Sequence, residues 1–288
     1  MLLTVVLAAL LSLSAATAQT ALGLQPPAKL YTLAPGESIT QTLRVDNPAS
    51  EPVAIRVYPG DWQFDAYGKS VFYPAGSLPQ SASSWITFTP SQLDLESREH
   101  GEIRYTLTVP PGTAPGTYWG VLFAEGENPN PTPGETLASF RIRTGHTFYV
   151  EVAPVTSSGE IAGLFTTPPA TSTDPYTFGV QYSNTGTKLQ RLTGRIEVRD
   201  TSGATVATIP LDGIISLPGS TRTITAQLYG PLAPGDYTAL VVLNYGDPTL
   251  DVAGEAFFTL DQPLAEGRLL FAPDEDTADA GGQTGDTQ

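Results

Sequence analysis

The side chains that most often carry chemistry are few in this sequence and stand apart from one another. Among 288 residues there are two histidines, His100 and His146, and no cysteine. A hydrolytic triad needs a nucleophile beside a histidine that a carboxylate orients, and a structural zinc site needs several histidine or thiolate ligands. The sequence also has no G-x-S-x-G motif. We therefore expect no enzyme, no catalytic residue, no metal site and no cofactor.

Three weaker patterns in the sequence stand against that expectation. A glycosidase site needs only two carboxylates, and the chain has 29 acidic residues. The run Gly68-Lys69-Ser70 is similar to the end of a phosphate loop, but position 63 is Gln where such a loop needs glycine. Asp61 and Asp65 lie close in sequence, without the further oxygen ligands that a calcium ion takes. None of these patterns predicts a site on its own.

The elements that must position these residues are predicted by a stretch that occurs twice. Residues 114–123 (APGTYWGVLF) and 233–243 (APGDYTALVVL) each place Pro-Gly before a tyrosine and a run that is apolar on both parities. Pro-Gly favours a turn, and a strand that is apolar on both sides must have both faces covered. Alternating stretches precede both copies, at 101–110 and 221–230. The repetition predicts two equivalent β units in series.

Composition and spacing extend this prediction to the whole chain. With 28 glycines, 26 prolines and no long helical period, the sequence is typical of an all-β protein. About seven short strands per unit predict two tandem immunoglobulin-like β-sandwich domains. The strands expected are 25–33, 38–46, 52–58, 85–88, 101–109 and 116–124, then 176–182, 194–199, 205–211, 221–229, 235–244 and 252–260. An Asp-Asn-Pro turn predicts that strands 38–46 and 52–58 form a hairpin.

The N-terminus predicts export from the cytoplasm. Residues 1–18 contain an apolar run and end in an A-x-A pattern before Gln19, which is typical of a cleaved signal peptide. The run is shorter than the ~20 residues that span a bilayer. We therefore expect a secreted, periplasmic or cell-envelope protein without a transmembrane anchor.

Domain boundaries follow from the change in pattern along the chain. The expected domains are 24–153 and 154–262, with Pro154 at the hinge, followed by an acidic, disordered tail at 263–288. The formal net charge of −15 argues against nucleic acid as a partner, because phosphate backbones bind clustered Lys and Arg.

The longest strand candidate is 135–152, where even-numbered positions are mainly apolar. Unbroken, it would be near 60 Å at about 3.3 Å per residue, so a bend is expected at residues 144–145. His146 falls in the apolar row, where a hydrogen-bonded structural histidine is expected.

The most aromatic segment is 61–73, with Trp62, Phe64, Tyr67 and Phe72. One interpretation is a surface platform for sugar rings or a protein partner, because aromatic side chains offer a large contact area. The other is a hairpin that turns at residues 67–68 and whose aromatic side chains cover the end of the sandwich.

Several short motifs together resemble a known family. They are LRVDNP at 43–48 with VAIRV at 53–57, VP at 109–110 with PGTYWGV at 115–121, and FRIR at 140–143 with FYV at 148–150. They resemble the N-terminal domain of periplasmic pilus chaperones (PapD-like). They are also similar to cell-wall proteins of the WxL-interacting family, which carry two such domains. The resemblance covers most of 24–152 and extends more weakly over 160–260.

The chaperone resemblance implies a mechanism of partner binding. In that family the last strand of the first domain lends alternating apolar side chains to an incomplete pilus subunit and completes its sheet. Ala138, Phe140 and Ile142 stand where those residues would be, with Arg143 beside them. Lys29 is a loose counterpart of the first-strand basic residue that holds the subunit's terminal carboxylate, whereas the position of the last-strand lysine is a threonine here. The implied partner is an envelope or pilus-like protein subunit.

The second resemblance implies an alternative. In the WxL-interacting family the first domain is associated with peptidoglycan, and the aromatic segment would then bind a cell-wall polymer. That family's C-terminal membrane helix has no counterpart in this sequence. Both alternatives describe a non-enzymatic envelope protein: an assembly chaperone that binds by strand addition, or a wall-associated adhesion module.

Overall fold

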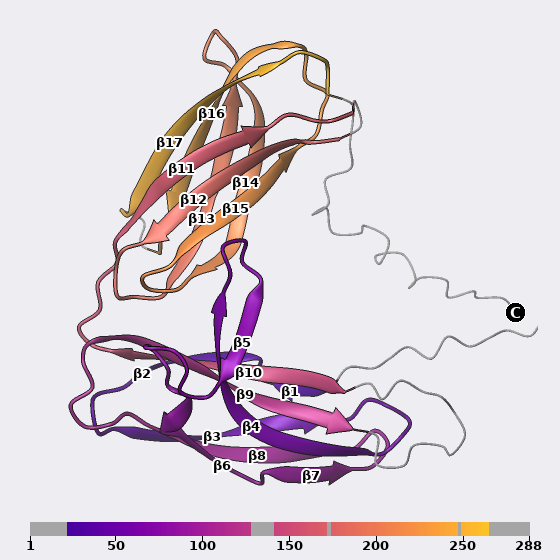
Figure 1. Ribbon diagram of the computed structural model, residues 1–288, viewed down its shortest axis with the longest axis vertical. Coiled ribbons are helices and arrows are strands. Elements are labelled where there is room, and N and C mark those ends of the chain that lie inside the picture. The colour runs from indigo at the N-terminus through magenta and orange to yellow at the C-terminus, as the bar shows by residue number, and fades with distance from the viewer. Residues whose placement is uncertain (1–21, 128–140, 172–173, 247–248, 265–288) are drawn as a thin grey trace, which may run out of the picture.

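The computed structural model describes residues 22–127, 141–171, 174–246 and 249–264. Within these ranges the regular secondary structure is all β-strand apart from one short 3-10 helix, η1 (Ser83–Trp85). The strands form two sandwiches in tandem, the first from β1 to β10 and the second from β11 to β17 (Figure 1). The predicted fold of two immunoglobulin-like sandwiches is confirmed. The expected signal peptide and most of the expected tail lie outside the described residues.

The first sandwich packs a four-stranded sheet against a larger one. The four-stranded sheet has the order β1 (Gly23–Gln25), β3 (Ser38–Asp46), β8 (His100–Thr108), β6 (Ile86–Thr89). The other, which we call the large sheet, has the order β2 (Ala28–Thr32), β10 (Ile142–Val152), β9 (Gly116–Glu127), β4 (Val53–Phe64), β5 (Ser70–Pro74), and β7 (Gln92–Leu95) also pairs with β4.

Alternation along the strands decides which side chains enter the first core. In β8 Ile103, Tyr105 and Leu107 are at most 1% exposed, and in β10 the even-numbered Phe148 and Val150 join them. Full burial of one such side chain stabilises the fold by roughly 1.5–3 kcal/mol. The odd-numbered residues of β10 point to the opposite face of the large sheet, which we call the outer face.

The predicted hairpin between 38–46 and 52–58 is wrong. β3 pairs with β1 and β8, whereas β4 pairs with β9, β5 and β7 in the other sheet. The turn between them carries the chain across the sandwich, and Asn47 holds it there. This buried side chain donates to the carbonyls of Glu51 at 2.8 Å and Glu96 at 2.9 Å, which ties the turn to the β7–β8 loop.

The second sandwich repeats the plan of the first. One sheet has the order β11 (Gly159–Thr167), β12 (Tyr176–Asn184), β15 (Thr221–Leu228), and the other β14 (Thr205–Ser216), β13 (Gln190–Arg199), β16 (Gly235–Asn244), β17 (Asp251–Leu260). The repeated stretches are the equivalent strands β9 and β16. In both, the tyrosine hydroxyl donates to the alanine carbonyl four residues earlier, at 3.0 Å for Tyr118 and 2.8 Å for Tyr237.

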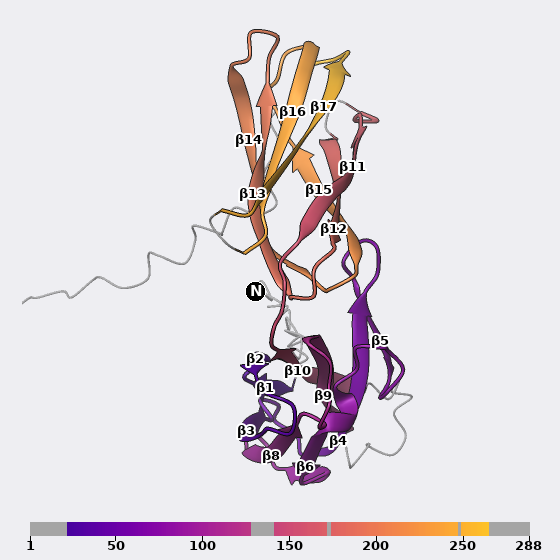
Figure 2. The same cartoon turned by 90° about the vertical axis from the view of Figure 1, so that its left-hand side faces the viewer.

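An aromatic cluster joins the two sandwiches, whose strands run in different directions (Figures 1 and 2). Its members are buried residues of both: Trp62, Trp119, Val121, Phe123 and Tyr149 from the first, with Leu189 and Leu217 from the second. The Thr117 N–H donates to the Thr187 carbonyl at 3.0 Å beside this cluster. Part of the outer face of the large sheet is thereby covered by the second sandwich.

Candidate partner-binding edge and face

β10 is the strand on which the sequence predicts partner binding, and its outer edge is only partly covered. β9 pairs with it antiparallel along its whole length, from Ile142 opposite Gly126 to Val152 opposite Gly116. On the other side β2 pairs with it in parallel only from Thr147 to Glu151. Among the described residues, no strand pairs with the outer edge of 142–146. We call this stretch the open edge.

Hydrogen bonds at the covered end show which main-chain groups the open edge presents. The Thr147 N–H donates to the Pro27 carbonyl, and the Glu151 carbonyl accepts from the Leu33 N–H. Odd-numbered residues of β10 therefore direct their main chain toward β2, and even-numbered residues direct theirs toward β9. By the same alternation, Arg143 and Gly145 direct their N–H and C=O groups out of the open edge.

Coverage by β2 ends because of two prolines. The strand expected at 25–33 is broken: β1 pairs with β3 in the four-stranded sheet, and β2 begins at Ala28 in the large sheet. Pro26 and Pro27 lie between them and have no N–H to donate to a ladder. The first strand thus leaves β10 just where the open edge begins. Pro26 and Pro27 were the signal in the sequence from which this open edge could have been predicted. The sequence pattern instead predicted one continuous strand at 25–33.

His146 fixes that crossing point from inside the core. Its Nδ1 lies 2.6 Å from the Pro26 carbonyl and its Nε2 lies 3.2 Å from the Tyr105 hydroxyl. A carbonyl can only accept, so Nδ1 carries the proton and Nε2 accepts from Tyr105, which in turn accepts from Tyr31. Burial lowers the pKa of His146, because it disfavours the charged imidazolium. The predicted hydrogen-bonded structural histidine is confirmed.

The predicted strand-addition residues are only partly in view. Ala138 and Phe140 lie outside the described residues. Ile142 begins β10 and packs, half-buried, against the first core. The ladder with β9 keeps its register at 144–145, so no bulge lies there, and the bend expected at these residues stays a prediction.

Lys29 is exposed on β2 beside the covered part of β10. It stands opposite Phe148, five residues along the strand from Arg143, or about 16 Å at 3.3 Å per residue. The structure therefore does not bring Lys29 and Arg143 together. Lys29 flanks the end of the open edge, and the binding role suggested for it stays a prediction.

Arg143 turns its side chain onto the outer face of the large sheet. Its guanidinium carbon lies 4.5 Å from the ring centre of Phe123 and 5.0 Å from that of Phe72. Such cation–π contacts contribute about 0.5–1 kcal/mol at exposed sites. Phe72 is 43% exposed, so part of this pair remains open to solvent. The open edge is therefore bordered by a positive charge held over two aromatic rings.

Two glycines make room for the ring beneath that charge. A Cβ on Gly60 would lie 2.8 Å from Cε2 of Phe123, and one on Gly145 would lie 2.8 Å from Cγ2 of Val121. Glycine thus lets these side chains lie directly over the main chain of β4 and β10. The sequence motifs did not reveal Phe123 or Gly145 as members of this face, because the partners come from strands distant in sequence.

A polar patch continues the outer face away from the second sandwich. The Tyr58 hydroxyl donates to Oε2 of Glu125 at 2.6 Å, and Arg56 lies 4.8 Å from the Tyr58 ring centre. Burial, and then the bond to Glu125, raise the pKa of Tyr58. A shallow hollow follows, lined by Arg56, Glu125, Arg141, Gln92 and Asp94. This end of the face carries both charge signs.

The predicted aromatic surface platform is corrected in part. Trp62 is 4% exposed and belongs to the cluster between the sandwiches. Phe64 packs edge-on against it, with the two ring centres 4.9 Å apart. Trp62 is buried and Phe64 partly buried because β4 is long enough to reach the second sandwich. Tyr67 (77%) and Phe72 (43%) are exposed. The hairpin turning at residues 67–68 is confirmed as β4–β5.

Asp61 and Asp65 do not share an ion site. Asp61 is fully buried and accepts hydrogen bonds from the Leu78 N–H and from the hydroxyls of Ser81 and Ser83, at 2.6–2.9 Å. Asp65 accepts from two N–H groups of its own turn. In the part of the chain that the structure describes, no three His, Asp or Glu side chains are grouped as metal ligands would be. The described residues also contain no helix that is long and apolar enough to cross a membrane.

Comparison with known proteins gave matches only at the level of structure. No protein-family model matches the chain, and no curated protein matches its sequence. The YadV chaperone is 12% identical, with 83% of this chain and 100% of that chain covered and a TM-score of 0.42.

Two further similar structures contain a bound subunit. The Salmonella enterica SafB chaperone, solved with the SafA pilin, is 16% identical, with 85% and 99% of the two chains covered and a TM-score of 0.41. The CsuC–CsuE chaperone–tip adhesion subunit complex of Acinetobacter baumannii is 11% identical, with 83% and 98% covered and a TM-score of 0.44. These similarities are distant, and the fold described above rests on this chain's own strands.

Proposed function

We propose that this chain is an extracytoplasmic binding protein of the pilus-chaperone type, which takes a β-strand of a partner subunit on the open edge of β10. The observation that carries the proposal is the open edge itself. β9 holds residues 142–146 as a strand, while the outward main-chain groups of Arg143 and Gly145 have no strand beside them among the described residues. Unpaired edge groups of this kind are a template for an added strand.

The surroundings of the edge favour a partner strand with alternating side chains. One row of the added strand would lie level with Ile142, which packs against the core. The other row would lie on the outer face, next to Arg143 over Phe72 and Phe123. Main-chain bonds would supply affinity and these two rows would supply selectivity. The class of partner, a pilus-like envelope subunit, comes from the motifs at 43–57, 109–121 and 140–150.

Arg143→Pro tests the edge without touching the ladder to β9. Proline removes the outward N–H of residue 143 and is tolerated where a strand's N–H faces solvent. Arg143→Gln is the matched control, since it removes the charge and keeps the N–H. Each variant would be co-expressed with candidate pilus-type subunits and the complex purified. We expect Arg143→Pro to lose the complex and Arg143→Gln to keep most of it.

The same variants separate the proposal from its alternative. Equal complex formation by both variants would contradict strand addition at this edge. Pelleting of both variants with purified cell wall, without any subunit complex, would support the wall-associated module instead. Circular dichroism and thermal unfolding of each purified variant establish that the sandwich is intact.

A further inference from the structure

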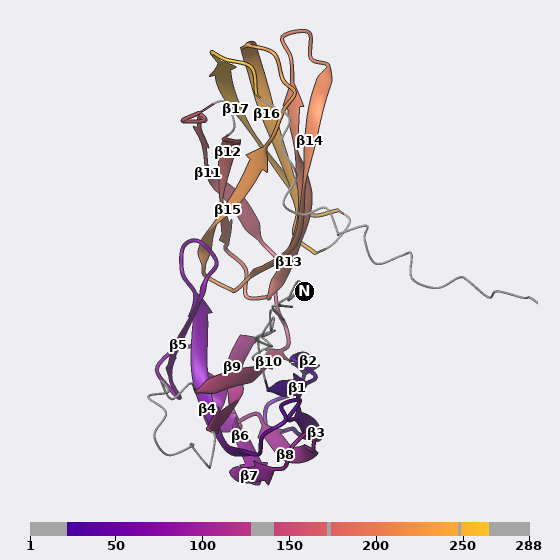
Figure 3. The same cartoon turned by 90° about the vertical axis from the view of Figure 1, so that its right-hand side faces the viewer.

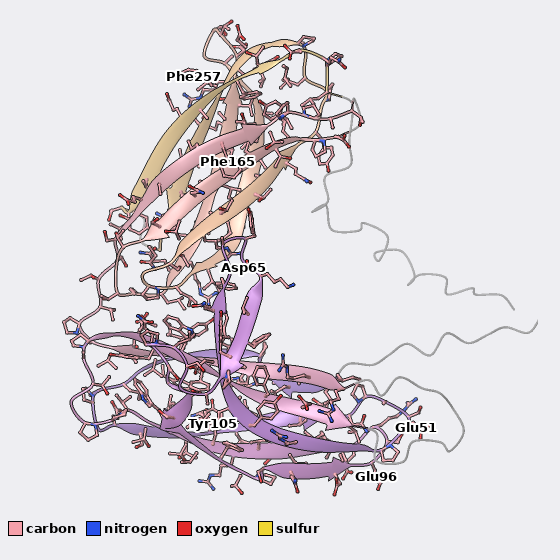
Figure 4. The ribbon with its side chains drawn as sticks, in the orientation of Figure 1. Glu51, Asp65, Glu96, Tyr105, Phe165 and Phe257 are labelled. Atoms are coloured by element: carbon pink, nitrogen blue, oxygen red, sulfur yellow. The ribbon has the colours of Figure 1, made fainter. Side chains whose placement is uncertain are left out.

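The tip of the β4–β5 hairpin reaches beyond its own sheet to the second sandwich. Figures 2 and 3 show the hairpin standing out of the first sandwich toward β15, and Figure 4 labels Asp65 at its tip. The N–H of Thr223, in β15, donates to the Ala66 carbonyl at 2.7 Å. β15 is the last strand of its sheet. The turn at residues 65–68, which we call the strut tip, therefore pairs with an edge of the second sandwich.

Arg222 packs the strut tip against β15. Its guanidinium carbon lies 4.7 Å from the ring centre of Phe64, and its Nη1 donates to the Ile215 carbonyl at 2.7 Å. The Nε atom is buried without a hydrogen-bond partner. The main chain of Gly68 covers the guanidinium so closely that a Cβ there would lie 2.6 Å from Cζ. The Arg222 side chain is thus partly desolvated and contacts both sandwiches.

The strut tip has a fixed shape of its own. Oδ1 of Asp65 accepts from the N–H groups of Tyr67 and Lys69, both at 2.9 Å. The Asp65 N–H donates to the Lys69 carbonyl at 2.9 Å, and Gly68 closes the turn at a φ of +84°. These bonds hold the turn without help from the second sandwich.

The chain contains a second turn built in the same way. Between β13 and β14, Oδ1 of Asp200 accepts from Ser202 and Ala204 at 2.8 and 3.0 Å, and Gly203 has a φ of +85°. A Cβ on Gly203 would meet nothing within 4 Å. The two turns share their backbone geometry, and only the strut tip is pressed against another part of the protein.

We propose that the β4–β5 hairpin is a strut between the two sandwiches and that Arg222 is the positioning residue that fastens it, so that the second sandwich stands at one fixed angle over the large sheet. The Thr117–Thr187 bond holds the linker side of the joint, and the aromatic cluster extends from there to Phe64, beneath the strut tip. The linker-side bond alone permits rotation about it, whereas a second attachment at the strut tip defines an angle. The inference rests on these contacts and not on the proposed function.

Distance measurements between spin labels test the strut. The natural chain has no cysteine, so Ser97→Cys in the first sandwich and Thr208→Cys in the second give unique labels on exposed positions. Double electron–electron resonance would be recorded for this labelled protein and for the same protein with Gly68→Ala, Gly203→Ala, Arg222→Gln or Arg195→Gln. Gly203→Ala carries the same turn strain as Gly68→Ala, and Arg195 is an exposed arginine of the second sandwich.

We expect one narrow distance distribution for the parent, Gly203→Ala and Arg195→Gln. We expect Gly68→Ala and Arg222→Gln to broaden it at least twofold. The first change displaces the guanidinium from its contact with the strut tip, and the second removes it. A broad distribution in the parent would overturn the inference. So would a Gly68→Ala distribution as narrow as that of Gly203→Ala, even if its Tm were lower, because the contact would then stabilise the fold without setting the angle.

Discussion

At the scale of single residues, alternation along a strand predicts which side chains are buried but not which residues they contact. Parity along β10 placed His146 in the core correctly. It could not supply the partners, because Tyr105 and Pro26 are 41 and 120 residues away in the chain. The same limit applies to Asp61, whose closest acidic neighbour in sequence suggested an ion, while its actual partners are serine hydroxyls and a main-chain N–H some twenty residues later.

The buried imidazole predicts how stability depends on pH. The folded pKa of His146 lies below the ordinary 6.5, so the unfolded chain binds a proton first as the pH falls. Stability from this group is complete above pH 6.5 and is lost as the pH falls from there through the folded pKa. Urea unfolding at pH 8 and pH 5.5 should show a steeper loss for the wild type than for His146→Gln.

His146→Gln is expected to be less stable than the wild type at pH 8, because a flexible amide replaces a fixed ring. The informative quantity is the loss of unfolding free energy from pH 8 to pH 5.5, compared between the two proteins. An equal loss in both would mean that another group produces the pH dependence.

Asp61 predicts a second effect at this scale. Asp61→Ala leaves three donors without their acceptor, among them the buried Ser83 hydroxyl, and should cost roughly 3 kcal/mol in the free energy of unfolding. Asp61→Asn keeps one acceptor oxygen and should cost less. Urea denaturation of both variants measures this, and an Asp61→Ala protein as stable as the wild type would show that the loop at 74–83 does not depend on the carboxylate.

Elements were easier to predict than their pairing. The Gly and Pro turns and the alternating runs marked most strands within a few residues, including the hairpin at Tyr67 and Gly68. They could not show that β3 and β4 belong to different sheets, because both strands have one buried face in either arrangement. β7 and β11 were missed altogether, since short or weakly alternating edge strands have little pattern of their own.

The close approach of β9 to β10 predicts a coupling between two small changes. Gly145→Ala brings a methyl group against Val121 and should destabilise by about 1–3 kcal/mol. Val121→Ala removes the methyl that it meets, so the double variant should lose less than the sum of the two single losses, by about 1 kcal/mol. Chemical denaturation of the four proteins gives the coupling. Strictly additive losses would mean that the strands move apart instead.

At the scale of the whole molecule, the sequence predicted two sandwiches but not the joint between them. Trp62 shows why. Its segment is apolar enough to cover the end of its own sandwich or to bind a ligand, and the sequence does not record that Leu189 and Leu217 will lie against it. Burial in this joint also raises the pKa of Tyr149 to about 12. The second sandwich thereby decides which aromatic residues of the first stay exposed.

The shared cluster predicts how the two sandwiches unfold. Leu217 is 2% exposed and contributes to the joint from the second sandwich. Leu217→Ala should cost about 2–5 kcal/mol and separate one calorimetric transition into two. Val206→Ala, at an exposed position of the second sandwich, should leave a single transition. Two transitions already present in the wild type would contradict thermal coupling through the joint.

The crossing of the first strand at Pro26 and Pro27 has a consequence for how the chain is made. β2 pairs only with β10 among the described strands, and its partner residues Thr147–Glu151 lie more than a hundred positions later. A polypeptide that emerges from its N-terminus must therefore keep β2 unpaired until most of the first sandwich has been delivered. Contacts so far apart in sequence are slow to form. β2 therefore pairs late, on the same side of β10 as the open edge, where we place the partner strand.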